Sequence, residues 1–255
     1  MRFPLLQPPP PVSAEEPPPL PQVVTLRGNF SDVYQQVETA AFAGLGPASV
    51  GPKVSRLQKI LARWNPRLGV EVNGVFDLKT ERAISLYQAI YSKSGGAVIS
   101  GEVSQHLVRM SDGSFWNHPP TKTPGQQLLY QAAQQLGVPY RLGGDGVSST
   151  DCGRLVQQST AKLAPELSRC ADEQYRSAQK GLHGLSVVRE PQAGDLVFFR
   201  YPSSQSGEAY AGVTHVGLRV DSNWMLAASA GAGKVVVQKS APLRPYLLAT
   251  AGFRS

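Results

Sequence analysis

The stretch Thr150-Asp151-Cys152-Gly153-Arg154-Leu155-Val156 decides how the rest of the chain is interpreted. It places a cysteine where a loop rich in glycine and serine, residues 143–149, gives way to an apolar run compatible with a helix. The first turn of a helix carries partial positive charge and free N–H donors, and both favour a thiolate over a thiol. We expect Ser149 or Thr150 to cap this helix and Cys152 to face a cleft from its first turn.

A histidine follows the cysteine at the start of a strand-like run, in Thr214-His215-Val216-Gly217. A thiol near its ordinary pKa is mostly protonated, so a nucleophilic cysteine needs an adjacent base. We therefore predict that Cys152 is a nucleophile and His215 its general base, with the backbone N–H of Cys152 stabilising an oxyanion. A cysteine taken alone is more often a small buried hydrophobe, and Cys170 keeps that interpretation.

The composition indicates a globular chain with an excess of positive charge. The 255 residues carry a formal net charge of +7, and the excess is concentrated in the second half. A basic surface suits an anionic polymer, either nucleic acid or bacterial cell wall. No run of lysine and arginine forms a nucleic-acid stripe, so no nucleic-acid partner is expected. His106, His118 and His183 lack metal-ligand spacing, so neither a metal nor a cofactor is expected.

The N-terminal segment is rich in proline. Residues 1–22 contain nine prolines, which predicts an extended tail with nothing to pack. Proline also interrupts the apolar start before the roughly seven residues that a secretory signal needs, and no stretch approaches the ~20 apolar residues of a membrane span. We expect no membrane association, and export by another route or with a leader absent from this sequence.

Composition divides the rest of the chain into two predicted domains. Residues 23–110 show helical spacing, residues 111–125 are rich in proline and glycine and form the predicted linker, and residues 126–255 hold the cysteine and the histidine. In the first domain, Asp77 is the expected cap of one helix. The helical spacing covers residues 31–42, 54–61, 78–91 and the segment that leads to Leu107 and Val108.

In the second domain, helices precede a series of strands. Helices are predicted over residues 126–136 and from Cys152, and residues 157–190 are assigned only as a helix followed by a loop. Strands are predicted over residues 196–199, 214–220, 224–228 and 234–238. This order predicts an α+β architecture in which helices pack on an antiparallel sheet.

Motifs in the first domain carry a resemblance. They are Leu57-Gln58, Asn73-Gly74-Val75-Phe76-Asp77, Thr80, Ala83-Ile84, Tyr87-Gln88 and Ser100-Gly101-Glu102-Val103. This segment resembles the three-helix peptidoglycan-binding module that is attached to cell-wall hydrolases. Asp77 stands where that module usually has glycine, and Tyr87 where it has phenylalanine. The alternative is a generic helical domain with two turns.

Motifs in the second domain carry a more specific resemblance, because their order and spacing match together. They are Gly137-Val138-Pro139-Tyr140 with Gly143-Gly144, Asp151-Cys152, Ala193-Gly194-Asp195-Leu196-Val197-Phe198-Phe199 and Thr214-His215-Val216-Gly217-Leu218. This half resembles the NlpC/p60 family of papain-like cysteine peptidases that cut stem peptides of peptidoglycan. The resemblance implies Cys152 as nucleophile, His215 as base and Tyr140 as a further hydroxyl donor. It implies that Asp151 either holds a substrate amine or is an ordinary helix-start carboxylate.

The chain departs from that family around both catalytic positions. The family usually has Asp-Cys-Ser-Gly, so Gly153 removes a hydroxyl that can contact substrate, and Arg154 adds a charge that can hold a stem-peptide carboxylate. The residue that orients the base is usually the histidine of Ile-His-Ala-Ser, and Ala227 occupies that position in Met225-Leu226-Ala227-Ala228-Ser229. Candidates to replace it are Ser229, Asn223 and a residue of the loop 203–210.

The sequence therefore predicts a monomeric peptidoglycan endopeptidase that hydrolyses a stem-peptide amide, the bond from γ-D-glutamate to the diamino acid. The alternative is a cell-wall-binding protein with an impaired catalytic domain, which Gly153 and Ala227 favour. Thioester acyl transfer is a third interpretation, but no stretch of the sequence indicates the acyl-donor pocket that it needs. Action in the periplasm or cell wall fits a secretion-system effector with an immunity or delivery partner, a phage lysin, or an enzyme whose leader was removed.

Overall fold

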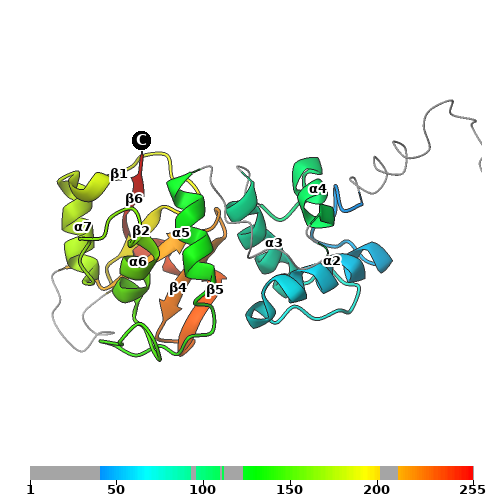
Figure 1. Ribbon diagram of the computed structural model, residues 1–255, viewed down its shortest axis with the longest axis horizontal. Helices are drawn as coiled ribbons and strands as arrows, with labels where there is room; N and C mark the ends of the chain where they lie inside the picture. The colour runs from blue at the N-terminus through cyan, green and yellow to red at the C-terminus, as the bar shows by residue number, and fades with distance from the viewer. Residues whose placement is uncertain (1–40, 93–95, 110, 112–122, 202–211, 255) are drawn as a thin grey trace, which may run out of the picture.

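The computed structural model describes residues 41–92, 96–109, 111, 123–201 and 212–254 of the chain (Figure 1). Several predictions lie outside these residues: the proline-rich tail over 1–22, nearly all of the helix over 31–42, most of the linker over 111–125 and the loop over 203–210.

The first part of the described chain is helical. Its elements are α2 (Pro52–Trp64), the short 3-10 helix η1 (Pro66–Leu68), α3 (Leu78–Tyr91) and α4 (Gly101–Arg109). The predicted bounds of α3 are confirmed, and so is its cap, because Asp77 Oδ1 accepts a hydrogen bond from the backbone N–H of Thr80 at 2.8 Å. The core of this part includes Trp64 and Tyr87, whose rings meet edge to face with centroids 5.0 Å apart.

The second part begins with helices and ends with strands. Its helices are α5 (Pro124–Ala133), α6 (Cys152–Thr160), α7 (Ala171–Gln179) and the 3-10 helices η3 (Leu182–Gly184) and η4 (Ala241–Tyr246). Its strands are β1 (Leu185–Val187), β2 (Leu196–Phe199), β3 (His215–Arg219), β4 (Trp224–Ser229), β5 (Lys234–Lys239) and β6 (Leu247–Phe253).

The strands form one six-stranded sheet in the order β1-β6-β2-β3-β4-β5, and every pairing is antiparallel. The predicted α+β class is confirmed. Four strands were predicted from their apolar runs, whereas β1 and β6 were not. They pair with each other, and β6 also pairs with β2, so the two missed strands form one edge of the sheet.

The two faces of the sheet have different coverings. Val216 and Leu218 of β3 join the large hydrophobic cluster beneath α5, α6 and α7. Successive residues of a strand point to opposite faces, so His215, Gly217 and Arg219 lie on the other face. A separate cluster covers that face; it consists of Val197, Phe199, Met225 and Ala227, with Tyr201, Leu243 and Tyr246 packed against it.

The helical part packs directly against the second part, and Figure 1 shows α3 beside α5. Asn65 Nδ2 donates to the carbonyl oxygen of Ala133 at 3.1 Å, and Trp224 Nε1 donates to Glu81 Oε1 at 3.2 Å. One hydrophobic cluster contains side chains from both parts. The domain boundaries remain predictions, although α5 already begins at Pro124, inside the predicted linker. Among the described residues, no helix is long and apolar enough to cross a membrane.

Candidate active site

Cys152 is the first residue of α6, and Asp151 caps this helix. Asp151 Oδ1 accepts a hydrogen bond from the backbone N–H of Arg154 at 2.8 Å. The prediction that Ser149 or Thr150 caps the helix is wrong, because the backbone of Thr150 is bridged to that of Tyr140 and its side chain is buried. The carboxylate of Asp151 therefore fixes where the helix begins, one residue before the thiol.

The second oxygen of the Asp151 carboxylate is also occupied. Asp151 Oδ2 accepts from the backbone N–H of Gly143 at 2.8 Å and from Arg169 Nη2 at 2.6 Å. Only 9% of the Asp151 side chain is exposed, compared with 42% of Arg169. These contacts are those of a helix-start carboxylate, and the predicted contact of Asp151 with a substrate amine remains a proposal.

The thiol of Cys152 lies between the start of α6 and β3. Burial raises the pKa of the Cys152 thiol, while backbone N–H groups of Val216, Gly153 and Cys152 itself act in the opposite direction and the charge of Asp151 adds to the rise. The helix start was expected to favour a thiolate, but desolvation outweighs it. In this structure the thiol form is favoured at neutral pH.

His215 opens β3, directly opposite Phe199 in the pairing with β2. Its side chain is buried among aromatic rings: the centroids of Phe199 and Tyr201 lie 5.9 Å and 6.0 Å from the imidazole, in stacked orientations. Burial lowers the pKa of His215 to about 4. The imidazole is therefore neutral at pH 7, as a general base requires.

The family position for the residue that orients the base is apolar here. Ala227 is fully buried on the face of the sheet that His215 shares, beside Phe199 and Met225. No residue in the described part of the chain forms a hydrogen bond with the His215 ring. The rings of Phe199 and Tyr201 stack on the imidazole.

Ser229 and Asn223 are predicted from the sequence as candidates for the residue that orients His215. Asn223 lies in the β3–β4 turn, at the opposite end of β3 from His215, so its position contradicts that role. Ser229 ends β4 at the end of the sheet where β3 begins, and its hydroxyl accepts a hydrogen bond from the N–H of Ala232 at 3.3 Å. Ser229 remains a proposal for the orienting residue.

Two tyrosines border the site. The backbone of Tyr140 is bridged to that of Thr150, two residues before Cys152. Burial raises the pKa of Tyr140, and the charges of Cys152 and Asp151 raise it further. Tyr201 was not identified from the sequence. It lies two residues after Phe199, the last residue of β2, and so continues the alternation of that strand. Burial and then the charge of Cys152 raise the pKa of Tyr201 to about 12, and the Tyr201 ring stacks on His215.

The packing around α6 explains why residue 153 is a glycine. A Cβ atom at this position would overlap the carbonyl oxygen of Arg169, and Gln174 Nε2 donates to the carbonyl oxygen of Gly153 at 2.9 Å. The segment that leads into α7 thus packs directly on the backbone of α6. Compared with the serine that the family usually has, Gly153 is predicted to lack a hydroxyl that can contact substrate. The structure shows instead that a side chain does not fit at this position.

The side chain of Arg154 is held by hydrogen bonds within the protein. Its guanidinium donates to Gln157 Oε1 at 2.8 Å and to the carbonyl oxygen of Asp145 at 3.0 Å. These bonds attach α6 to the glycine-rich loop over 143–149. The predicted contact of Arg154 with a substrate carboxylate remains a proposal.

Cys170 is exposed, so the expectation of a buried hydrophobe is wrong for it, and the described residues contain no disulfide bond to Cys152. Within the described ranges, no group of three or more histidine, cysteine, aspartate or glutamate side chains is arranged to hold a metal ion.

Comparison with known proteins defines the class of the chain. A model described as the NlpC/P60 family matches residues 137–247. The murein DD-endopeptidase MepS/murein LD-carboxypeptidase of Escherichia coli (strain K12) is 31% identical over 157 residues, which cover 61% of this chain and 70% of that protein. The chain belongs to the NlpC/P60 family.

Two further similarities cover shorter parts. The bifunctional muramidase/DL-endopeptidase CwlT of Bacillus subtilis (strain 168) is 35% identical over 126 residues, or 47% of this chain and 35% of that protein. The structure of NlpC1 from Trichomonas vaginalis aligns with a TM-score of 0.43 and 25% identity, covering 53% of this chain and 46% of that one. The chain thus spans about a third of its Bacillus relative.

Proposed function

We propose that the chain is a cysteine peptidase that hydrolyses an amide bond in the stem peptide of peptidoglycan. The observation that carries the proposal is the placement of Cys152 at the start of α6 against β3, which His215 opens. Membership of the NlpC/P60 family supports this assignment of nucleophile and base. The Bacillus relative is called a DL-endopeptidase, and the bond that we propose joins γ-D-glutamate to the diamino acid.

The chemistry starts from a neutral pair. Burial raises the pKa of Cys152 and lowers that of His215, so charge separation is disfavoured before substrate binds. The thiol proton passes to His215 as sulfur attacks the carbonyl carbon, and the N–H of Cys152 with the hydroxyl of Tyr140 stabilises the oxyanion. The imidazolium then protonates the leaving amine. Water, deprotonated by His215, hydrolyses the thioester and restores the thiol.

Family membership supports action outside the cytoplasm, which we place in the periplasm or cell wall, on peptidoglycan. We also propose that the chain acts as a monomer. The helical part is proposed as a wall-binding module on the motifs around Leu57-Gln58 and Asn73-Gly74. The settings that fit are an effector with an immunity or delivery partner, a phage lysin and a periplasmic enzyme.

A second candidate is a cell-wall-binding protein whose catalytic site is impaired. Ala227 favours it, because a polar orienting residue is replaced by a buried methyl group. The raised pKa of Cys152 favours it too, since the resting thiol is a weak nucleophile. This candidate retains affinity for peptidoglycan and releases no fragments.

Digestion of purified muropeptides at pH 7, followed by mass spectrometry, separates the two candidates. We expect new stem-peptide fragments with the wild-type chain and with Cys170→Ala, and none with Cys152→Ala. Cys170→Ala is the matched control because that cysteine is exposed. Fragments that persist in Cys152→Ala contradict the proposed nucleophile. Binding to peptidoglycan without fragments from any variant supports the impaired protein instead.

A further inference from the structure

Helix α7 is hydrogen-bonded to α6, the helix that begins with Cys152. Gln174 of α7 is fully buried, and its Nε2 donates to the carbonyl oxygen of Gly153 at 2.9 Å. Just before α7, the guanidinium of Arg169 donates to Asp151 Oδ2 at 2.6 Å. The start of α7 and the segment before it are therefore fixed against the two residues that flank the thiol.

The same helix also contacts the chain just before His215. Asp172, in the first turn of α7, accepts a hydrogen bond at Oδ1 from the backbone N–H of Val213 at 3.0 Å. A Cβ atom at Gly212 would overlap Asp172 Oδ1, so the carboxylate lies directly against the backbone of this glycine. Asp172 Oδ2 pairs with Arg176 Nη2, one turn later on α7, at 2.7 Å. One helix thus contacts both the helix of the nucleophile and the entry to the strand of the base.

The position of the imidazole of His215 depends on this backbone, because the ring itself has no hydrogen-bond partner among the described residues. On the side of β2, the N–H of Thr214 donates to the carbonyl oxygen of Phe199 at 2.9 Å, and Thr214 Oγ1 accepts from the N–H of Tyr201 at 2.8 Å. These bonds place the chain relative to the neighbouring strand. The bond to Asp172 places it relative to the layer of helices that carries the nucleophile.

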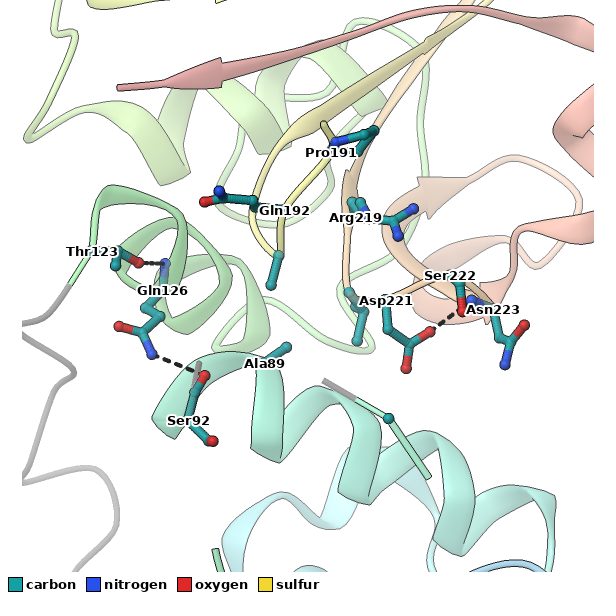
Figure 2. A pocket seen from close by; sticks show the side chains of 13 residues that line it. Ala89, Ser92, Thr123, Gln126, Pro191, Gln192, Arg219, Asp221, Ser222 and Asn223 are labelled. Atoms are coloured by element: carbon teal, nitrogen blue, oxygen red, sulfur yellow. Dashed lines mark hydrogen bonds between the residues drawn. The ribbon is translucent and has the colours of Figure 1, made fainter. Parts of the chain in front are cut away.

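The two ends of β3 have different surroundings. At the end remote from His215, Arg219 and Asp221 line a cavity of about 660 Å³ that also borders the end of α3 (Figure 2). At the end that carries His215, Val213 is buried and bonded to α7. Asp172 therefore ties β3 to the helices beside the base, whereas the remote end adjoins open space.

We propose that Asp172 is a positioning residue that holds His215 at its working distance from Cys152. It acts through the backbone N–H of Val213, two residues before the base. Proton transfer requires the two groups to lie within hydrogen-bond reach, and a displacement of about 1 Å can reduce a rate by about 10²-fold. Gly212 is part of the same contact, because its missing side chain gives the carboxylate room. The inference rests on the proposed function, which assigns the nucleophile and the base.

Steady-state hydrolysis of a stem tetrapeptide by the full chain, expressed per folded molecule, measures the effect on the reaction. Asp172→Ala removes the acceptor and should lower kcat about 10–100-fold while KM changes by less than about threefold. Asp172→Asn keeps Oδ1 as an acceptor and should retain at least about a third of the wild-type kcat. Gly212→Ala fills the space beside the carboxylate and should reproduce the loss. Glu173→Ala removes the neighbouring exposed carboxylate of the same turn and, as the matched control, should keep the wild-type kcat.

The C–H signals of His215 in nuclear magnetic resonance spectra, assigned with His215→Gln, report the position of the ring without turnover. The ring stacks on two aromatic side chains, whose ring currents contribute to these signals. We expect the signals to move in Asp172→Ala and in Gly212→Ala, and to stay close to their wild-type positions in the other two variants. The signals of His183, an exposed residue, should stay unchanged throughout.

A kcat within about twofold of wild type in both Asp172→Ala and Gly212→Ala overturns the positioning role, and so do unmoved His215 signals in these variants. A loss in Asp172→Asn as large as in Asp172→Ala also overturns it, because the charge and not the acceptor would then be responsible. If the wild-type chain hydrolyses no stem peptide, the proposed function fails, and the His215 signals still decide whether Asp172 places the ring.

Discussion

Two buried motifs of this chain differ in whether their polar side-chain atoms have hydrogen-bond partners. In the helical part, Gln58 uses its whole amide: Oε1 accepts from the backbone N–H groups of Asn73 and Gly74 at 3.0 and 2.9 Å. Its Nε2 donates to Asn73 Oδ1 and to the carbonyl oxygen of Val75, both at 2.8 Å, and to Thr80 Oγ1 at 3.0 Å. In the second part, the buried ring of His215 has no hydrogen-bond partner among the residues that the structure describes.

The difference separates a motif that builds the fold from a motif that is available for chemistry. A buried polar group with all its partners stabilises the native state, and one without them has a cost that a function can explain. The motif residues Leu57-Gln58, Asn73-Gly74 and Thr80 are therefore accounted for by the packing of α2 and α3. Cys152 and His215 are not accounted for by packing alone.

The largest expected effect comes from His215→Gln, which tests whether the unpaired ring acts as the base. Without a proton acceptor beside the thiol, kcat/KM for stem-peptide hydrolysis should fall about 10²–10⁴-fold. The measurement is the rate of fragment release, normalised to folded protein. His183→Gln changes an exposed histidine and should leave the rate unchanged. A His215→Gln rate above about a tenth of wild type contradicts the role as base.

Gln58→Met tests the other side of the comparison. It keeps the side-chain volume but leaves the N–H groups of Asn73 and Gly74 unpaired, so the free energy of unfolding should fall by roughly 3 kcal/mol. Urea denaturation measures this loss, and Gln105→Met is the exposed control on α4. The hydrolysis rate per folded molecule should not change. A stable variant with weakened activity would reverse the assignment of the two motifs.

The pH dependence of stability sharpens the comparison further. Burial lowers the pKa of His215 from 6.5 to about 4, so between these values the unfolded chain binds a proton that the folded chain does not. The free energy of unfolding should therefore fall as pH decreases from about 6.5 to about 4, by up to ~3 kcal/mol, and this contribution should level off below pH 4. Urea denaturation of wild type and His215→Gln at both ends of this range isolates the contribution. Parallel pH curves for the two proteins would show that His215 does not titrate in this way.

Gly153→Ser produces the smallest expected change and introduces the residue that the family usually has. Because a side chain overlaps the carbonyl oxygen of Arg169, we expect a loss of about 1–3 kcal/mol in stability and no gain in activity. Thermal unfolding together with the hydrolysis rate checks both. Gly101→Ser is the control, because no atom lies within 4 Å of a Cβ at that position. A more active and equally stable Gly153→Ser would support the lost-hydroxyl interpretation.

Sequence patterns predicted the elements whose signals are local. The helix over Leu78–Tyr91 and the strand over Leu196–Phe199 were found at their bounds, because periodic apolar residues and adjacent turn or cap residues mark both ends. The strand Leu247–Phe253 was missed because its pairing with β1 and β2 joins segments far apart in the chain. It also contains alanine, threonine and glycine, which give a weak strand pattern.

Only part of the candidate site could be predicted, because only some of its features have local sequence signals. Motif order identified Cys152 and His215, since each sits at the start of an element that the sequence marks. The contact of Tyr201 with His215 depends on how β2 and β3 pair, and the overlap at Gly153 depends on where the chain returns before α7. Desolvation of the thiol likewise depends on packing, so a helix start alone predicted the wrong direction for the Cys152 pKa.

The state of the His215 ring tests the neutral Cys152–His215 pair most directly. A nuclear magnetic resonance titration of the histidine C–H signals, assigned with His215→Gln, reports its protonation in the intact chain. We predict that the His215 signals stay at their neutral positions from pH 7.5 down to about 5 and move only near pH 4. A midpoint at or above the ordinary value of 6.5 would contradict the neutral pair and indicate a thiolate–imidazolium pair in its place.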